Sequence, residues 1–388
     1  MKRLISLVVI ATFFIVPTST AAVKKPAVKP LKLLTSIGNP DEFTGLVTTG
    51  KTIVIFGNKG DKSFARALDK TGKELWNLAL DPASPSVATA ATVDNTGTIW
   101  IAGSTSLSRA TPAPSPTAIP LNPDKVVSVP DIFTADLDAF SLWSINPTTQ
   151  ALAQYTLQLD APILINAIAA DSSGLSAVGS SGTIINADLL GHISKVVTVG
   201  STATTFEQVI KNADGTLTAI GSSTETLGGK KLVGKVDGVI IKISKANKII
   251  SLVRSSAAKA QRSWTSATSS LLLGGSVVTG SKTESAVTKF SAKFLPTWTY
   301  RFASTGTAFT AGSTFALIQS TGAISQLAGW SPKSPQGLLI SFDSKGVING
   351  GYSAPNEQIQ LLGLFASKDL GILCITSSAD TVSIFTLN

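Results

Sequence analysis

A short apolar segment that ends in Gly-Ser, or in a close variant of it, recurs seven times along the chain. Val, Ile, Leu and Thr dominate the residues before the glycine, so each copy is expected to form a β-strand. The copies lie 42 to 76 residues apart, which is typical of proteins built from repeated units. They are Val54–Asn58, Ile99–Ser104, Ser176–Ser180, Thr218–Ser222, Val277–Ser281, Leu327–Trp330 and Leu373–Ser377.

Turn sequences around these segments predict four strands in each unit, named a, b, c and d in chain order. Asp94–Gly97 represents the a–b turn and Asp69–Gly72 the c–d turn. An Asp side chain opens such a turn, and Gly supplies the positive φ at its end. Four short antiparallel strands per unit form a β-propeller blade, and seven blades lie within the range of known propellers. The sequence therefore predicts an all-β fold, a seven-bladed β-propeller of four-stranded antiparallel blades.

The two ends of the chain predict how the ring closes. The last unit supplies strands a, b and c and then ends one strand short, at Thr381–Leu387. The strand Leu31–Ser36 has no partner near it in the sequence. Placing this N-terminal strand as strand d of the last blade closes the ring and hides edges that would otherwise recruit other chains. We therefore expect a closed ring and a monomer.

The first 22 residues have the pattern of a signal peptide. Lys2 and Arg3 precede an apolar run over residues 4–16, and small residues follow up to Ala22. The run of 13 residues is shorter than the roughly 20 that span a bilayer, although an uncleaved anchor is the alternative. The expected organisation is a signal peptide over 1–22, a Pro/Lys linker over 23–30 and one propeller domain over 31–388. Such a chain would be secreted or held in the cell envelope, with no membrane span after signal removal.

Long insertions between strands b and c are the feature most relevant to function. The largest is a Pro-rich segment over 105–135, and the next is Ser223–Val236. In a propeller the b–c and d–a connections share one face, so we expect variable loops to crowd that face. The composition of the Pro-rich segment also suits a disordered decoration. Trp330, just before a shorter b–c loop, is the one aromatic side chain that we single out as a candidate glycan contact.

Composition argues against several classes of function. The net charge is +9, but only 14% of residues are charged and the basic ones are scattered, unlike those of a nucleic-acid binder. His192 is the only histidine and lies in an expected c–d turn, so we assign no catalytic residue. Gly45–Thr52 matches a phosphate-loop pattern, yet a strand rather than a helix follows it. Cys374 is alone within an apolar strand, which excludes a disulfide within the chain.

Acidic residues near the insertions have a structural and a functional interpretation. Asp131, Asp136 and Asp138 could contribute to a calcium site, but their spacing fits no known cage, so we expect solvated loop acids and assign neither a metal nor a cofactor. Asp138 and Asp237 each begin a strand c. We expect their carboxylates to accept hydrogen bonds from backbone N–H groups and to fix the ends of the loops.

Residues 221–243, with Gly221-Ser222 and then Asp237–Ile243, resemble the repeats of secreted bacterial β-propeller proteins. The resemblance covers about residues 42–388 at the level of the repeat, and it implies export and a propeller, without a common activity. Ala67–Trp76 is also similar to one repeat of the quinoprotein-type propellers. A quinone-dependent enzyme would carry that repeat in most blades, and here it occurs once.

Two hypotheses on function follow from these features. The first is an exported, non-catalytic binding module whose insertion-rich face holds a cell-envelope or extracellular polymer or protein, with an anionic cell-surface glycan as one candidate. The alternative is a lyase or hydrolase at the mouth of the central channel, which would need a cluster of titratable residues with perturbed pKa values there.

Overall fold

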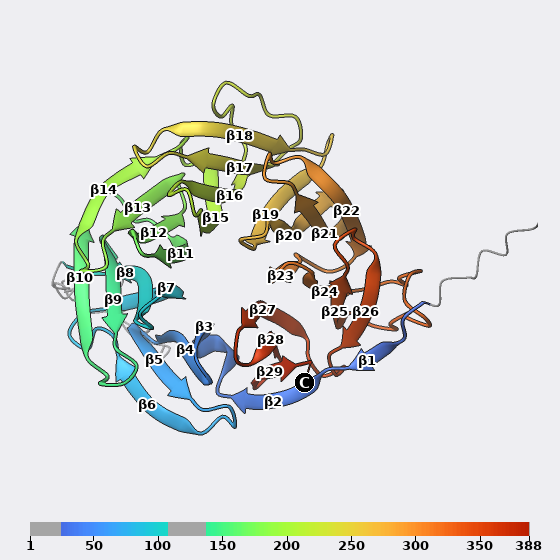
Figure 1. The fold of residues 1–388 in the computed structure, drawn as a ribbon, viewed down its shortest axis with the longest axis horizontal. Coiled ribbons are helices and arrows are strands. Elements are labelled where there is room, and N and C mark those ends of the chain that lie inside the picture. Colours follow the sequence, from blue (N-terminus) through green and yellow to red (C-terminus); the bar gives the residue numbers. More distant parts are fainter. Residues whose placement is uncertain (1–24, 108–136, 388) are drawn as a thin grey trace, which may run out of the picture.

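The computed structural model describes residues 25–107 and 137–387, and these form a ring of seven small β-sheets around a central channel (Figure 1). In this part of the chain the only helical element is a single 3-10 turn, η1 (Pro40–Glu42). No helix among the described residues has the length and apolarity needed to cross a membrane. The predicted seven-bladed β-propeller is thus confirmed. The signal-peptide residues 1–22 lie outside the described residues.

Each blade is an antiparallel sheet of four strands, ordered from the channel outward. Blade 1 consists of β3 (Phe43–Thr49), β4 (Thr52–Lys59), β5 (Lys62–Leu68) and β6 (Glu74–Ala79). Blade 2 consists of β7 (Ser86–Val93), β8 (Ile99–Thr105), β9 (Ala139–Ile145) and β10 (Leu152–Gln158). Blade 3 consists of β11 (Ile165–Asp171), β12 (Gly174–Gly179), β13 (Thr183–Ala187) and β14 (Ile193–Thr198). Blade 4 consists of β15 (Thr204–Lys211), β16 (Leu217–Ser223), β17 (Asp237–Ile243) and β18 (Ile249–Ser255).

The remaining three blades follow the same order, with two N-terminal strands added to the last two. Blade 5 consists of β19 (Gln261–Ala267), β20 (Leu272–Thr279), β21 (Lys282–Phe290) and β22 (Pro296–Ala303). Blade 6 consists of β23 (Phe309–Ala311), β24 (Phe315–Ser320), β25 (Gln336–Phe342), β26 (Ile348–Ser353) and β1 (Val28–Pro30). Blade 7 consists of β27 (Gln360–Ser367), β28 (Gly371–Ser377), β29 (Val382–Thr386) and β2 (Lys32–Ile37).

The ring closes through the pairing that the chain ends predict. β2 lies antiparallel to β29, with Leu33 opposite Phe385 and Ile37 opposite Val382. Figure 1 shows the blue β2 completing the red blade 7. The expected linker 23–30 differs from the structure at its end, because β1 pairs in parallel with β26 and becomes a fifth strand of blade 6. An unpaired sheet edge next to the extended chain offers backbone hydrogen bonds that a free linker would leave unused.

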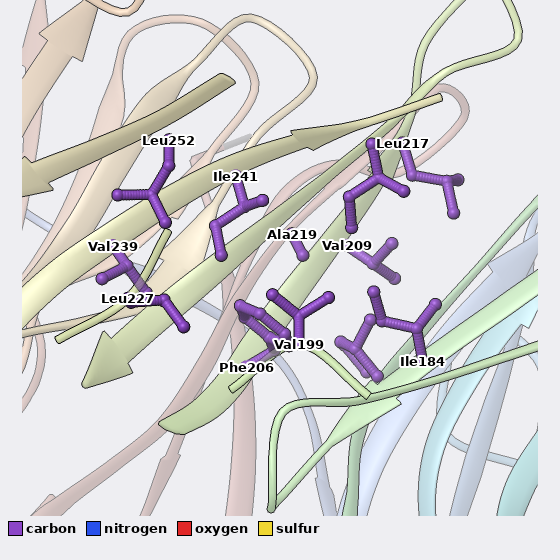
Figure 2. Close-up of a cluster of buried hydrophobic side chains, with 13 residues drawn as sticks. Ile184, Val199, Phe206, Val209, Leu217, Ala219, Leu227, Val239, Ile241 and Leu252 are labelled. Atoms are coloured by element: carbon purple, nitrogen blue, oxygen red, sulfur yellow. The ribbon is translucent and has the colours of Figure 1, made fainter. Parts of the chain in front are cut away.

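The core lies between the blades, where the apolar faces of neighbouring sheets meet. Figure 2 shows the cluster between blades 3 and 4, in which Ile184 and Val199 meet Phe206, Ala219 and Ile241. Burying one such aliphatic or aromatic side chain contributes about 1.5–3 kcal/mol of transfer free energy. Trp100, Trp143 and Trp264 are fully buried in equivalent clusters, as the alternation of apolar residues predicts.

A β-bulge explains the recurring glycine. In six blades strand a has an irregular register, and the strand-b residue facing it is a glycine in five of them. A Cβ on any of these glycines would lie 1.8–2.0 Å from a strand-a carbonyl oxygen or from the one just before the strand, so no other residue fits without a shift of the backbone. The five are Gly57, Gly103, Gly179, Gly221 and Gly275.

One of the seven predicted copies of the motif is wrong, and another follows its strand as predicted but is not equivalent to the bulge-facing glycines. In blade 5 the bulge faces Gly275, whereas Gly280 lies in the turn between β20 and β21 with φ of 60° and nothing within 4 Å of the place that its Cβ would occupy. In blade 6 the segment Leu327–Trp330 lies in the connection between β24 and β25. Strand a of blade 6 has only the three residues of β23, so the spacing of its repeat changes.

We expect Gly221→Ala to destabilise the protein by about 2 kcal/mol or more, because the added methyl group would overlap the Thr205 carbonyl oxygen. Urea unfolding followed by tryptophan fluorescence would measure the loss. Gly306→Ala is the matched control, since nothing lies within 4 Å of the place that its Cβ would occupy. Equal midpoints for the two variants would contradict the bulge explanation.

A disulfide across the closing pair should stabilise the ring. Ser36 and Ser383 are register partners with their Oγ atoms 3.5 Å apart, so Ser36→Cys with Ser383→Cys places two thiols at bridging distance. We expect a gain of about 2–4 kcal/mol in the oxidised form, since the bridge closes a very long loop in the unfolded chain. Thermal unfolding with and without dithiothreitol measures it. A melting temperature that does not fall on reduction would argue against this register.

Candidate ligand-binding face

The b–c and d–a connections lie on one face of the ring, which we call the insertion face. Its longest described connections are residues 224–236 in blade 4 and 321–335 in blade 6. Most of the Pro-rich insertion, residues 108–136, lies outside the described residues. Its two ends are held in place, because Leu107 N donates to Asp138 Oδ1 at 2.9 Å and Thr105 Oγ1 donates to Asp81 Oδ2 at 2.8 Å.

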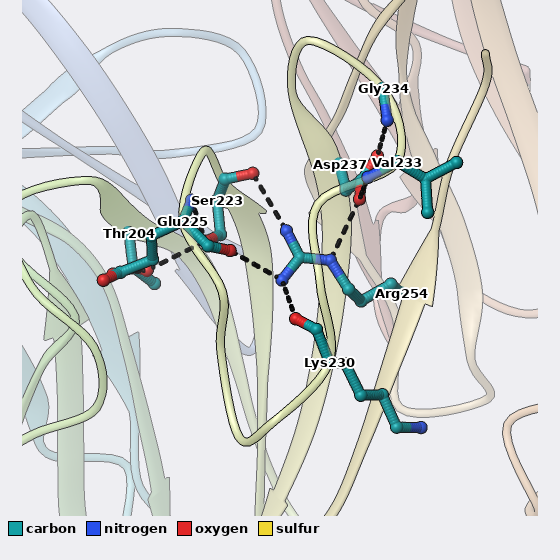
Figure 3. Close-up of polar contacts among 8 residues, drawn as sticks. All are labelled: Thr204, Ser223, Glu225, Lys230, Val233, Gly234, Asp237 and Arg254. Carbon is teal, nitrogen blue, oxygen red and sulfur yellow. Dashed lines mark hydrogen bonds and ion pairs between the residues drawn. The ribbon is translucent and has the colours of Figure 1, made fainter.

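An ion pair with almost no exposed surface organises the connection 224–236. Arg254 Nε lies 2.9 Å from Asp237 Oδ2, and the two side chains are 5% and 0% exposed. Arg254 comes from β18 and Asp237 begins β17, so neighbouring strands of blade 4 position both charges. The guanidinium also donates to carbonyl oxygens within the loop, to Glu225 at 2.8 Å and to Lys230 at 3.2 Å (Figure 3). The loop therefore wraps around one buried cation.

Asp237 holds the other end of this connection. Its carboxylate accepts hydrogen bonds from Val233 N at 3.0 Å and Gly234 N at 2.9 Å. Burial alone would raise the pKa of Asp237, but these hydrogen bonds and the one from Arg254 outweigh it and lower the pKa. The expectation that an Asp at the start of strand c fixes a loop end is confirmed at Asp237, and Asp138 acts in the same way on Leu107.

Glu225 anchors the loop to the preceding d–a connection. Its carboxylate accepts hydrogen bonds from Thr204 Oγ1 at 2.6 Å and from Ser201 N at 2.7 Å, shown in part in Figure 3. The hydrogen bond from the Thr204 hydroxyl is the main reason that the pKa of Glu225 is lowered. The connection is thus a preorganised structure rather than a free loop, which matters because rigid sites lose less entropy on binding.

Three exposed lysines on this preorganised loop and its neighbour form what we call the basic group: Lys231, Lys235 and Lys259. Lys235 N donates to Ala260 O at 2.7 Å, which fixes the loop against the d–a connection that carries Lys259. Within the part of the chain that the structure describes, none of the three ammonium groups has an ion-pair partner. Val233, 65% exposed, lies between Lys231 and Lys235. This surface suits an anionic partner with some apolar character.

The channel offers little support for catalysis. A cavity of about 280 Å³ is lined by the seven innermost strands, and the side chains that line it are Thr, Ser, Asn, Gln, aliphatic residues and Phe. Glu207, the residue before the lining residue Gln208, is partly buried, and this burial raises its pKa. Among the described residues no hydrogen bond or ion pair joins it to a second titratable group. A lyase or hydrolase at the mouth of the channel would need several titratable groups close together, and Glu207 is a single carboxylate.

The remaining sequence candidates lie apart from one another. Trp330 is half-buried against the core between blades 5 and 6, and its indole N–H donates to Ser320 Oγ at 3.2 Å. His192 lies in the turn between β13 and β14, on the face opposite the insertions, with Nδ1 2.8 Å from Asp188 Oδ2. Cys374 is buried between blades 6 and 7, and burial raises the pKa of its thiol far above the ordinary value.

Two sequence patterns remain, the phosphate-loop pattern and the three acidic residues considered for calcium. Gly50 and Lys51 form the turn between β3 and β4, so the phosphate-loop pattern is a hairpin. Of the three acidic residues considered for calcium, Asp131 and Asp136 lie outside the described residues. The described residues contain no group of three or more His, Cys, Asp or Glu side chains that could hold a metal ion.

Sequence reasoning missed Arg254 altogether. It identified Asp237 as a loop anchor, but its partner is 17 residues further on in the next strand. The available signal was the pairing of an Asp at the start of strand c with an Arg at the end of strand d, since antiparallel neighbours bring those two ends together.

Comparisons with known proteins show that the fold is shared, but they show no shared function. The structure is similar to the WD40 repeats of RRP9, with 9% identity, a TM-score of 0.55 and coverage of 94% of this chain and 99% of that one. It is similar to U3-55K, with 8% identity, a TM-score of 0.57 and coverage of 93% and 100%. It is also similar to the hydrazine synthase of Kuenenia stuttgartiensis, with 10% identity, a TM-score of 0.51 and coverage of 95% and 99%. At these identities the likeness shows a β-propeller and no activity.

No protein-family model and no curated protein matches the sequence. The propeller part of the predicted resemblance is confirmed, while its narrower form, a likeness to secreted bacterial repeat proteins, stays a prediction.

Asp237→Asn should cost about 3–5 kcal/mol of folding free energy, because it leaves the Arg254 cation buried without its counter-charge. A carboxyl with a lowered folded pKa stabilises the protein above its unfolded pKa of about 3.9, and that contribution is lost as the pH falls through the folded value. The variant should therefore have a lower free energy of unfolding at pH 7. Below pH ~4 its free energy of unfolding should fall less steeply with decreasing pH than that of the wild type. Urea titrations across pH measure both, with the exposed Asp160→Asn as control. Identical acid limbs for Asp237→Asn and the wild type would refute this role.

Proposed function

We propose that this protein is an exported, non-catalytic binding module whose insertion face holds an anionic polymer of the cell envelope or extracellular space. The observation that carries the proposal is the basic group, because three unpaired lysines lie on a loop made rigid by the Arg254–Asp237 pair and on the connection bonded to it. The signal-peptide pattern in residues 1–22 supports export. An anionic cell-surface glycan fits the charge, and the exposed Val233 fits its apolar ring faces.

The alternative, a lyase or hydrolase at the mouth of the channel, has weaker support. Such an enzyme needs an acid, a base or a cation near one another. The described channel lining supplies only uncharged side chains next to the single carboxylate of Glu207.

Replacing the basic group with glutamine should weaken binding to an anionic glycan such as heparin about 10- to 100-fold at low salt. Three exposed ion pairs contribute up to about 1 kcal/mol each, and salt screens them. Surface plasmon resonance at two salt concentrations would measure the affinity for heparin of the triple variant that combines Lys231→Gln, Lys235→Gln and Lys259→Gln.

The matched control changes three exposed lysines in c–d turns on the opposite face: Lys70→Gln, Lys73→Gln and Lys345→Gln. Both triple variants lose the same charge, so equal losses would indicate attraction by net charge alone and would contradict a site on the insertion face. Removing residues 105–135 tests the Pro-rich insertion separately. If the partner is a protein instead of a glycan, the propeller should still capture it from envelope extracts after the extracts have been treated with glycosidases.

A further inference from the structure

A pocket of about 430 Å³ lies where blade 7 meets blade 1, close to the closing strand β2. This volume is within the range of small-molecule sites in proteins. Residues of β2 and β29 in blade 7 and of β3, β4, β5 and β6 in blade 1 line the pocket, and Figure 1 shows these two blades next to each other. It lies outside the channel and on a different blade junction from the basic group, so it requires its own explanation.

Arg66 breaks the repeat at this junction. In blade 1 it faces the preceding blade from strand c, opposite Ile55, which is two residues before the bulge-facing Gly57. In five other blades a buried side chain without charge occupies the same register position: Trp143, Ile185, Ile241, Thr288 and Phe385. A cation where the other blades place core residues departs from the local packing rule, and such departures are typical of functional positions.

The guanidinium of Arg66 has unused hydrogen-bonding capacity. Its Nε is buried and has no hydrogen-bond partner among the described residues. Its nearest carboxylate is Glu74, half-exposed, with Nη1 and Oε2 3.7 Å apart, beyond hydrogen-bonding distance. A guanidinium offers five N–H donors in a planar fork that matches a carboxylate in two parallel hydrogen bonds. Arg66 therefore keeps N–H donors at the pocket wall that could pair a carboxylate.

The rest of the pocket is apolar at its floor and charged at its rim. Ile37, Ile55 and Val382 are buried, and Phe43 and Phe64 are partly exposed toward the same space. The rim lysines Lys59 and Lys62 face carboxylates at 3.6 and 3.8 Å, much as Arg66 does at 3.7 Å, but their side chains are 76% and 38% exposed, against 27% for Arg66. Arg66 is the least exposed of these three cations, and its buried Nε has no hydrogen-bond partner among the described residues, so one guanidinium is available to a ligand. A single guanidinium suits a single carboxylate better than a multiply charged phosphate.

We propose that this pocket binds a small organic acid, a carboxylate carried on an apolar chain or ring, with Arg66 pairing the carboxylate and Phe43 and Phe64 contacting the apolar body. The acid is either free or the end of a larger molecule, and both share this chemistry. The site is independent of the proposed polymer binding, since it lies on other blades and uses other residues.

Isothermal titration calorimetry of the full chain with 3-phenylpropanoate and octanoate tests the proposal, with the corresponding amides as uncharged counterparts. We expect a Kd below about 1 mM for at least one acid and at least tenfold weaker binding of its amide. Arg66→Ile places at this position the residue that blades 3 and 4 have there, Ile185 and Ile241, so the variant should melt at a temperature no lower than the wild type. It should bind the acid at least tenfold more weakly. Arg66→Gln serves as the second variant. Ala79→Trp, at the exposed edge of the pocket, should block entry while leaving Arg66 in place.

The matched control is Arg301→Ile, which removes another strand arginine that also lies 3.7 Å from a glutamate and is distant from the pocket. It should bind the acid as the wild type does. No binding of either acid up to about 10 mM, amides that bind as well as acids, or wild-type affinity in both Arg66 variants would each overturn the proposal. A peptide ending in Phe, compared with its C-terminal amide, shows whether the pocket also takes the end of a larger molecule.

Discussion

The pairing of β2 with β29 is the contact on which the rest of the structure depends. Each blade exposes an apolar face on both sides, and only a neighbour on both sides buries it. If the first and last blades did not meet, the cluster that joins Ile37, Leu46 and Ile384 would face water. At about 25 cal/mol per Å² of apolar surface, that exposure would cost more than single hydrogen bonds recover. The five register pairs of β2 and β29 therefore complete the blade that closes the ring.

The blades of the ring repeat one backbone pattern, whereas the connections between their strands differ from blade to blade. The bulge and its facing glycine recur in blade after blade because a backbone carbonyl oxygen occupies the space of a Cβ. The connections on the insertion face vary instead, and each has its own anchor. Arg254 and Asp237 hold one loop, while Asp138 holds the base of the largest insertion. A buried ion pair stabilises less than its Coulomb energy suggests, but it selects one loop conformation.

Most of the architecture could be predicted from the sequence, because strand periodicity and turn residues are local signals. The number of blades and the closing strand followed from them. The errors arose where a local pattern had two possible matches: Gly280 has the same neighbours as a bulge-facing glycine, but it forms a turn. The strand β1 was missed because its partner, β26, lies more than 300 residues away along the chain.

The candidate sites were less predictable for the same reason. Arg254 and Arg66 carry no motif, and their importance appears only from the register of the strands. Arg66 is unusual because five equivalent positions in other blades carry buried uncharged residues, a comparison that needs the pairing of every blade. Trp330, chosen as an exposed aromatic, is half-buried because it packs on the core and Ser320 accepts its indole N–H.

The closing pair also sets an order of events during biosynthesis. Ser36 of β2 leaves the ribosome 347 residues before its register partner, Ser383 of β29. The nascent polypeptide can form individual hairpins as they emerge, but blade 7 has to wait until β29 has been synthesised. Such a long-range contact favours slow folding and prolonged exposure of strand edges. A chain with this topology closes its ring only after its last blade has been made.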